Sequence, residues 1–216
     1  MIIVKKSCRL PRKNSKRLIF SNTQVSHLLL FLFVTFISCD SDYTPKPRGY
    51  FKINFPQKKY QVFNQPGFPY TFEYPVYAAI SRDTSFFGEA PENNWWINVD
   101  FPTFDGKIYM SYKEIGKYKL DKLVNDAYNM TNKHSVKAYS IDDSAFVSPN
   151  NVHGVFFKVG GDVATANQFF ITDSTKSFLR GALYFNAAPN QDSLAPVNAF
   201  LLEDMRHLVN TFQWKK

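Results

Sequence analysis

The chain has 216 residues, of which 44% are hydrophobic, 17% aromatic and 20% charged. This composition excludes an intrinsically disordered chain, and the length allows one hydrophobic core, which the aromatic content predicts to be β-rich. The formal net charge is +8, but residues 1–38 hold seven of the 26 basic side chains and no acidic one, so we expect a nearly neutral body without a nucleic-acid partner.

An apolar run near the N-terminus has the pattern of a secretion signal. Residues 28–37 are almost unbroken apolar, and they follow the basic segment. A membrane-spanning helix needs about 20 such residues, whereas the core of a signal peptide needs only about 7–15. The pattern therefore predicts that residues 1–38 are a signal peptide that is removed.

A cysteine directly follows this run. The stretch Phe36-Ile37-Ser38-Cys39 resembles the bacterial lipobox, in which a small residue precedes a cysteine that becomes lipidated. In that chemistry the Cys39 thiol takes a diacylglyceryl group, and cleavage frees its amine for further acylation. Each buried methylene contributes about 0.8 kcal/mol, so two or three acyl chains would anchor the protein stably. The alternative is that Cys39 is an ordinary buried thiol.

The residues after the cysteine predict a tether followed by a single domain. Residues 39–49 are polar and contain two prolines, which favour extended backbone, and we place the domain at residues 50–216. Apolar alternation at residues 51–55 and 70–74 suits short edge strands or extended segments on a core.

A hairpin and a helix come next. Residues 95–101 and 108–112 alternate in polarity, which predicts two strands joined by a five-residue loop in which Gly106 can adopt a positive φ. Apolar residues then recur at helical spacing between Leu120 and Tyr128, which predicts a helix that ends near His134.

The remainder predicts strands at about 136–142, 152–159, 165–172 and 177–186. A last helix follows, with Ser193 as N-cap, Pro196 in its first turn and a buried stripe that ends at Phe212. Strands joined by tight turns imply antiparallel pairing. The fold class is therefore predicted to be α+β, a largely antiparallel sheet packed with two main helices, and this order resembles a Mog1/PsbP-type sandwich.

The sequence contains no recognisable catalytic or metal-binding pattern, so we expect no enzyme, no metal and no cofactor. Two carboxylate pairs occur: Asp142-Asp143 is predicted to lie in a loop, and Glu203-Asp204 on a solvated helix face. The histidines of the body are His134, His153 and His207, and they form no zinc-binding spacing. His134 and His207 are expected to face solvent or cap helices, and His153 to sit in a turn at the entry of a strand.

The aromatic surplus suggests a binding surface. On a strand, Trp95 and Trp96 point to opposite faces, so at most one of them lies in the core and the other is exposed if one face is open. Trp96 or Tyr109 would then stack on a ligand or contact a partner. This gives the alternative hypothesis of an envelope module that binds a glycan or a peptide through exposed aromatic residues.

Four ordered stretches resemble a known family. They are Cys39-Asp-Ser-Asp-Tyr-Thr-Pro-Lys-Pro-Arg-Gly-Tyr50, Phe101-Pro-Thr-Phe-Asp-Gly-Lys-Ile-Tyr109, Gln168-Phe-Phe-Ile-Thr-Asp-Ser-Thr175 and Phe178-Leu-Arg-Gly-Ala-Leu-Tyr-Phe-Asn186. The chain resembles the gliding motility lipoprotein GldD family of Bacteroidota over nearly all of its length beyond residue 38.

The resemblance implies a non-enzymatic, periplasm-facing lipoprotein of the cell envelope that is required for gliding and is associated with type IX secretion. Its partners would be the membrane, through the lipid anchor, and other envelope proteins of the gliding and secretion machinery. The resemblance carries over no catalytic residue and only one functional position, the acylated Cys39.

Overall fold

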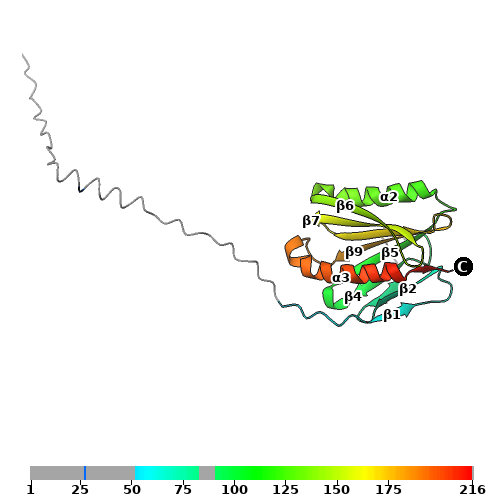
Figure 1. The fold of residues 1–216 in the computed structure, drawn as a ribbon, viewed down its shortest axis with the longest axis horizontal. Coiled ribbons are helices and arrows are strands. Elements are labelled where there is room, and N and C mark those ends of the chain that lie inside the picture. Colours follow the sequence, from blue (N-terminus) through cyan, green and yellow to red (C-terminus); the bar gives the residue numbers. More distant parts are fainter. Residues whose placement is uncertain (1–26, 28–51, 83–90, 216) are drawn as a thin grey trace, which may run out of the picture. The chain divides into compact units, whose positions relative to one another are not determined.

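The computed structural model describes His27, residues 52–82 and residues 91–215. Its contacts divide the chain into two units, Met1–Gly49 and Tyr50–Lys216. The predicted signal peptide and tether, with Cys39, lie outside the described residues apart from His27. The second unit has the predicted α+β fold, with antiparallel sheets and two main helices (Figure 1).

Within the described residues, seven strands form one sheet in the order β3-β4-β5-β9-β8-β7-β6, and every pairing is antiparallel. The strands are β3 Ala79–Arg82, β4 Ile97–Phe101, β5 Gly106–Glu114, β6 Ala138–Val147, β7 His153–Gly161, β8 Asn167–Thr172 and β9 Ser177–Phe185. A second, three-stranded sheet has the order β1-β2-β10, with β1 Tyr60–Phe63, β2 Tyr70–Pro75 and β10 Gln213–Trp214.

Two α-helices pack against the large sheet, α2 at Leu120–Asn132 and α3 at Gln191–Thr211. Short 3-10 helices, η1 at Pro102–Phe104 and η2 at Lys133–Val136, follow β4 and α2. Figure 1 shows α2 above the strands and α3 on the other side of them. The domain therefore consists of α2, the large sheet, and a layer formed by α3 with the small sheet.

Helix α2 covers only part of its face of the sheet. Its buried residues Leu123 and Ala127 contact Phe157, Phe170 and Phe178, which lie on β7, β8 and β9. Since side chains alternate along a strand, the same face continues along β5 and β4, beyond the edge of α2. That uncovered part of the face becomes important for the candidate site.

The main core lies on the opposite face. Leu201, Met205 and Leu208 of α3 are fully buried, and they pack with large aromatic side chains from both sheets. The largest of these aromatic residues are Tyr70, Phe72, Phe101, Phe169 and Phe212. Each such side chain stabilises the fold by about 1.5–3 kcal/mol through burial alone. Many of the phenylalanines thus pack in the core between the two sheets and α3, which agrees with the β-rich core predicted from the aromatic content.

Two predictions about turns were wrong in detail. The N-cap of α3 is Asn190, whose Oδ1 accepts from the backbone N–H of Ser193 at 2.9 Å, so the helix starts earlier than predicted. In the β4–β5 loop, Asp105 adopts the left-handed conformation at φ 46, and Gly106 already belongs to β5. Aspartate tolerates this region because its short polar side chain can bond locally.

Three short strands, β1, β3 and β10, were not predicted, and residues 52–59 form no regular element. Strands of four and two residues offer too little alternation to be recognised from sequence. The described part of the predicted strand at 51–55 instead lies against α3, where the Phe55 ring stacks on the Phe200 ring at 4.5 Å.

Asp173 closes the tight turn between β8 and β9. Its Oδ1 accepts from the backbone N–H groups of Thr175, Lys176 and Ser177 at 3.0, 2.7 and 2.8 Å. Ser174, inside this turn, has a left-handed φ of 62. Burial of the Asp173 carboxylate works against its charge, but the three N–H donors outweigh it, and the pKa of Asp173 is lowered.

We expect Asp173→Asn to destabilise the protein by about 1 kcal/mol at pH 7, because a neutral amide accepts these hydrogen bonds more weakly than a carboxylate. A carboxylate with a lowered pKa stabilises the fold above its ordinary pKa, about 3.9, and this contribution is lost as the pH falls through the lowered value. The difference in urea midpoint between wild type and Asp173→Asn should therefore shrink between pH 5 and pH 3. A constant difference would contradict the charge argument.

Candidate functional site

The lipidation prediction cannot be placed in the structure, since Cys39 lies outside the described residues. In the part of the chain that the structure describes, no helix combines the length and apolar character needed to cross a bilayer. The candidate sites that the structure shows all lie in the folded domain.

Trp96 is a core residue and not an exposed anchor. Its side chain is 6% exposed, and its Nε1 donates to the backbone oxygen of Tyr112 at 2.7 Å. Trp95 is half-buried, and its Nε1 donates to the backbone oxygen of Gly67 at 2.8 Å. Both tryptophans precede β4, which begins at Ile97, and both pack against the main core.

Tyr109 is half-buried on β5, where its ring meets the edge of the Tyr184 ring at 5.6 Å between centroids. Lys107 places its Nζ 5.5 Å from the centre of the Tyr109 ring. Tyr109 lies on the same face as Ser111 and Lys113, since these three residues are two apart along the strand. A stacking role for Tyr109 or Trp96 stays a prediction.

A pocket lies between α2 and the uncovered part of the sheet. Its volume is about 230 Å³. Its walls combine apolar and charged side chains from α2, β5, β9 and the segment before β4: Glu92, Trp96, Ser111, Lys113, Leu123, Asp126, Ala127, Met130, Phe178 and Arg180. Trp96 thus lines a pocket, and Tyr109 does not.

Arg180 is the central cation of this pocket. It lies on β9, directly opposite Ser111 of β5, and a guanidinium N–H donates to Oε1 of the fully buried Gln168. Tyr184 is a second hydrogen-bond partner of Arg180. Burial lowers the pKa of Arg180. Burial also lowers the pKa of His134, and the charge of Arg180 adds to that shift. Arg180 nevertheless stays charged, because a guanidinium is not deprotonated in proteins.

The second cation of the pocket is already neutralised. Lys113 donates to Oε1 of Glu92 at 3.0 Å, and the Tyr118 hydroxyl donates to the other oxygen of the same carboxylate at 3.0 Å. Burial of Glu92 works against its charge, but the hydrogen bonds from Lys113 and Tyr118 outweigh it, and the pKa of Glu92 is lowered. This ion pair forms one end of the pocket.

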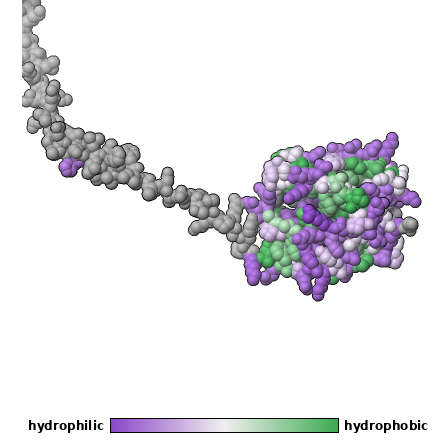
Figure 2. Space-filling model, viewed as in Figure 1, coloured by the Kyte–Doolittle hydropathy of each residue, from purple (hydrophilic) through white to green (hydrophobic). Residues whose placement is uncertain are grey.

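A second surface lies between the β6–β7 hairpin and α3. Figure 2 shows hydrophobic side chains gathered on the visible face among hydrophilic ones. A groove of about 430 Å³ runs here, and its apolar wall includes Phe146, Val147, Phe156 and Leu202. Val147 is 58% exposed at the end of the edge strand β6, so this surface can serve as a contact site for another protein.

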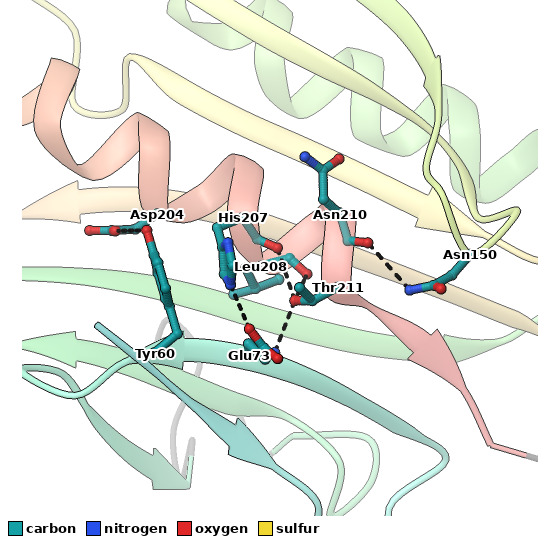
Figure 3. Close-up of polar contacts among 8 residues, drawn as sticks. All are labelled: Tyr60, Glu73, Asn150, Asp204, His207, Leu208, Asn210 and Thr211. Atoms are coloured by element: carbon teal, nitrogen blue, oxygen red, sulfur yellow. Dashed lines mark hydrogen bonds and ion pairs between the residues drawn. The ribbon is translucent and has the colours of Figure 1, made fainter. Parts of the chain in front are cut away.

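Asp204 is buried, which contradicts the prediction of a solvated carboxylate pair. Its side chain is 1% exposed, and its two oxygens accept from Lys58 Nζ at 2.7 Å, from the Tyr60 hydroxyl at 3.0 Å and from the Tyr77 hydroxyl at 2.5 Å. Glu203, its neighbour, is exposed, since adjacent helical residues point in different directions. The cluster joins the start of the domain to α3, and Figure 3 shows the contact between Tyr60 and Asp204.

His207 is not a solvent-facing residue. Its Nε2 lies 2.7 Å from Oε2 of Glu73, and its ring stacks on the Tyr60 ring at 3.5 Å between centroids. Figure 3 shows His207 and Thr211 of α3 turned toward Glu73 of β2, whose backbone N–H donates to Thr211 Oγ1 at 3.0 Å. These contacts join the small sheet to α3.

The remaining chemical candidates are not brought together. Asp142 and Asp143 lie within β6, not in a loop, and they oppose Lys158 and Phe157 of β7. His153 opposes Val147, four residues further along β6, which separates it from Asp143 by about 13 Å along the strand. Among residues 52–82 and 91–215, no group of three or more histidine, cysteine, aspartate or glutamate side chains is arranged to hold a metal ion.

The sequence did not single out Arg180, and it assigned Asp204 wrongly to a solvated helix face. Arg180 carries a detectable signal, because it is a lone charge in the otherwise apolar strand Phe178–Leu183 and alternates with residues of the main core. Asp204 carries none, since its helical pattern is shared by many exposed carboxylates.

The described residues thus form an α+β domain that carries a small charged pocket beside α2 and an apolar groove beside α3. The chain belongs to the gliding motility lipoprotein GldD family, whose family model matches residues 40–214. No curated protein matches the chain. Among solved structures, the solution structure of cyanobacterial PsbP (CyanoP) from Synechocystis sp. PCC 6803 is similar, with a TM-score of 0.44 and 14% identity over 79% of this chain and 99% of that chain.

Proposed function

We propose that this protein is a non-enzymatic, periplasm-facing component of the cell envelope, held to a membrane by acyl chains on Cys39. In this proposal residues 1–38 are removed, residues 39–49 form a tether, and the domain acts through protein contacts in a machinery for gliding that is associated with type IX secretion. The observation that carries the proposal is the match of the gliding motility lipoprotein family to residues 40–214.

Two further observations support the proposal. The stretch Phe36-Ile37-Ser38-Cys39 has the order of a lipobox at the end of an apolar run of the length of a signal-peptide core. The groove beside β6 and α3 exposes apolar side chains, and Val147 among them is 58% exposed. A protein partner that covered these side chains would remove apolar surface from water, which stabilises a complex.

Replacing Cys39 by serine should abolish acylation, because the hydroxyl does not replace the thiol that carries the diacylglyceryl group. In the source bacterium we expect Cys39→Ser to lose incorporation of labelled palmitate and membrane sedimentation. The Cys39→Ser strain should also be as defective in spreading and in export of secreted cargo as a strain that lacks the gene.

The chain offers a matched control in its other cysteine, Cys8, which lies within the predicted signal peptide. Cys8→Ser should leave labelling, sedimentation and spreading unchanged. Labelled palmitate on Cys39→Ser would refute the anchor, and normal spreading and secretion in a deletion strain would refute the role.

The alternative function, a module that binds a glycan or peptide, is favoured by one observation. The pocket beside Trp96 has apolar walls and an unneutralised cation, which suits a peptide better than an uncharged sugar. The exposed aromatic platform that the sequence suggested is not the basis for this alternative, since Trp96 is buried in its wall.

A further inference from the structure

Arg180 is a half-buried cation in the wall of the pocket, and its hydrogen-bond partners among the described residues carry no charge. A guanidinium has five N–H donors, and those of Arg180 have two uncharged partners, Gln168 and Tyr184. None of the described ion pairs includes Arg180. Charged side chains that are largely removed from water are normally paired with an opposite charge. The structure therefore has a cation whose counterion is not supplied by the residues described.

The groups behind Arg180 hold it in place and do not neutralise it. Gln168 is fully buried, and its Oε1 also accepts from Thr131 Oγ1 at 3.3 Å, so two donors share one oxygen. Its Nε2 is buried without an acceptor within the described residues. Hydrogen-bond donors thus exceed acceptors around Arg180. An added group with two acceptor oxygens would correct this imbalance.

The other charges of the pocket restrict what can enter. Lys113 already binds Glu92 at 3.0 Å, so Arg180 is left as the cation available to a ligand. Asp126, on α2, contributes a second carboxylate to the wall and forms no ion pair with any described residue. Asp126 would repel a doubly charged phosphate, and it could accept from the N–H groups of a peptide. The balance of charges favours a group with one negative charge.

The size and walls of the pocket point to a short peptide segment. Its volume of about 230 Å³ lies below the range of about 300–1,000 Å³ that is usual for drug-sized ligands. Trp96, Leu123 and Phe178 are buried residues of the wall, and Met130, 39% exposed, stands at its rim. These side chains can enclose one apolar side chain next to the charged group.

We propose that this pocket binds a carboxylate of a peptide segment from a protein partner, with Arg180 as the counterion and the adjacent apolar side chain against Trp96, Leu123 and Phe178. A planar guanidinium suits a carboxylate because it can form two parallel N–H···O bonds with it. The carboxylate belongs either to a chain terminus or to an acidic side chain. The inference deepens the proposed function, since it names the chemistry of one protein contact.

The test is a titration of the full chain in detergent micelles, followed by the ¹H–¹⁵N resonances of the tryptophan indoles and of the Arg180 side chain. The probes are N-acetyl-leucine, which has a terminal carboxylate, and the amidated dipeptide of N-acetyl-leucine with aspartate, which has a side-chain carboxylate. N-acetyl-leucinamide is the uncharged control. We expect saturable shifts of the Trp96 and Arg180 signals, with millimolar Kd for at least one acid, while Trp95 and Trp214 change little.

Variants assign the binding to Arg180. Arg180→Gln should weaken binding at least tenfold, and Lys122→Gln, an equal change of charge at an exposed residue outside the pocket, should not change it. If Arg180→Gln does not fold, Met130→Glu at the exposed rim should weaken binding several-fold by repelling the carboxylate.

Equal binding of N-acetyl-leucinamide, a larger effect of inorganic phosphate, absence of any saturable shift, or unchanged binding by both variants would each overturn the proposal. The acid that binds more tightly identifies the source of the carboxylate. Since the titration does not depend on acylation or motility, its failure is distinguishable from failure of the Cys39 experiment.

Discussion

Replacing Lys58 by methionine should lower the free energy of unfolding by about 3 kcal/mol. Lys58 Nζ donates to Oδ1 of the buried Asp204 and to the backbone oxygen of Phe200, both at 2.7 Å. Methionine keeps the length of the side chain and removes the charge, so Asp204 is left as a buried carboxylate with hydroxyl donors alone. Removing one partner of a buried ion pair typically costs about 3–5 kcal/mol, and the 24% exposure of Lys58 places this pair at the lower end.

Equilibrium unfolding in urea measures the effect, and two variants control it. Lys59→Met alters an exposed neighbour and should change stability by less than about 0.5 kcal/mol. The double variant Lys58→Met/Asp204→Asn should be more stable than Lys58→Met alone, because the uncompensated charge is gone. A Lys58→Met variant as stable as Lys59→Met would show that the pair contributes no stability.

Under the proposed function, the ion pair between Lys58 and Asp204 lies where a pulling force on the lipid anchor would enter the domain. Lys58 and Phe55 precede the first strand, β1, and both contact Phe200 of α3. If the chain is anchored through Cys39, a load on the anchor reaches the domain through residues 52–59 before it reaches any strand. The contacts of Phe55 and Lys58 with α3 then bear this load before any strand pairing does.

The sequence predicted the fold class well because its alternation is strong where strands are long. Residues 97–101 and 106–114 form the predicted hairpin, and the helix that begins at Leu120 appears as expected. Burial follows the period in β5 and in α2, so their buried faces could be assigned from the pattern alone, whereas β4 is buried on both faces. Short strands and the residues that lie on α3 could not be assigned, since their conformation depends on tertiary contacts.

The candidate site was harder to predict, because it depends on which parts of a sheet face remain uncovered. The sequence does not reveal whether a tryptophan such as Trp96 lies in a core or on a surface. Trp96 lines a pocket because α2 leaves that part of the sheet uncovered. Arg180 of β9 lies opposite Ser111 of β5 because these two strands pair, although β6, β7 and β8 come between them in the chain. A sequence pattern does not contain that order when strands pair out of sequence.

Gly154 is a second position at which we expect a large effect. The sequence places its neighbour His153 in a turn at the entry of a strand, whereas Gly154 is the second residue of β7, between β6 and β8. A Cβ atom there would overlap the backbone oxygen of Phe170 and would approach Phe146 Cζ at 2.6 Å and Ile171 Cγ2 at 2.9 Å. Gly154→Ala should therefore destabilise the protein by about 3 kcal/mol, because the backbone of β8 cannot move away without breaking its pairing.

Gly160, near the other end of β7, is the matched control. A Cβ atom there would meet the Tyr139 ring at 2.7 Å and Ser140 Oγ at 2.8 Å. Tyr139 is 74% exposed, so it can turn outward at the loss of one exposed hydrogen bond, from Gln191 Nε2 to its hydroxyl. Gly160→Ala should thus cost less than about 1 kcal/mol in the same urea measurement. If both alanine variants were equally stable, close packing around Gly154 would not be the reason for glycine, and the conformation of a turn would again be the better explanation.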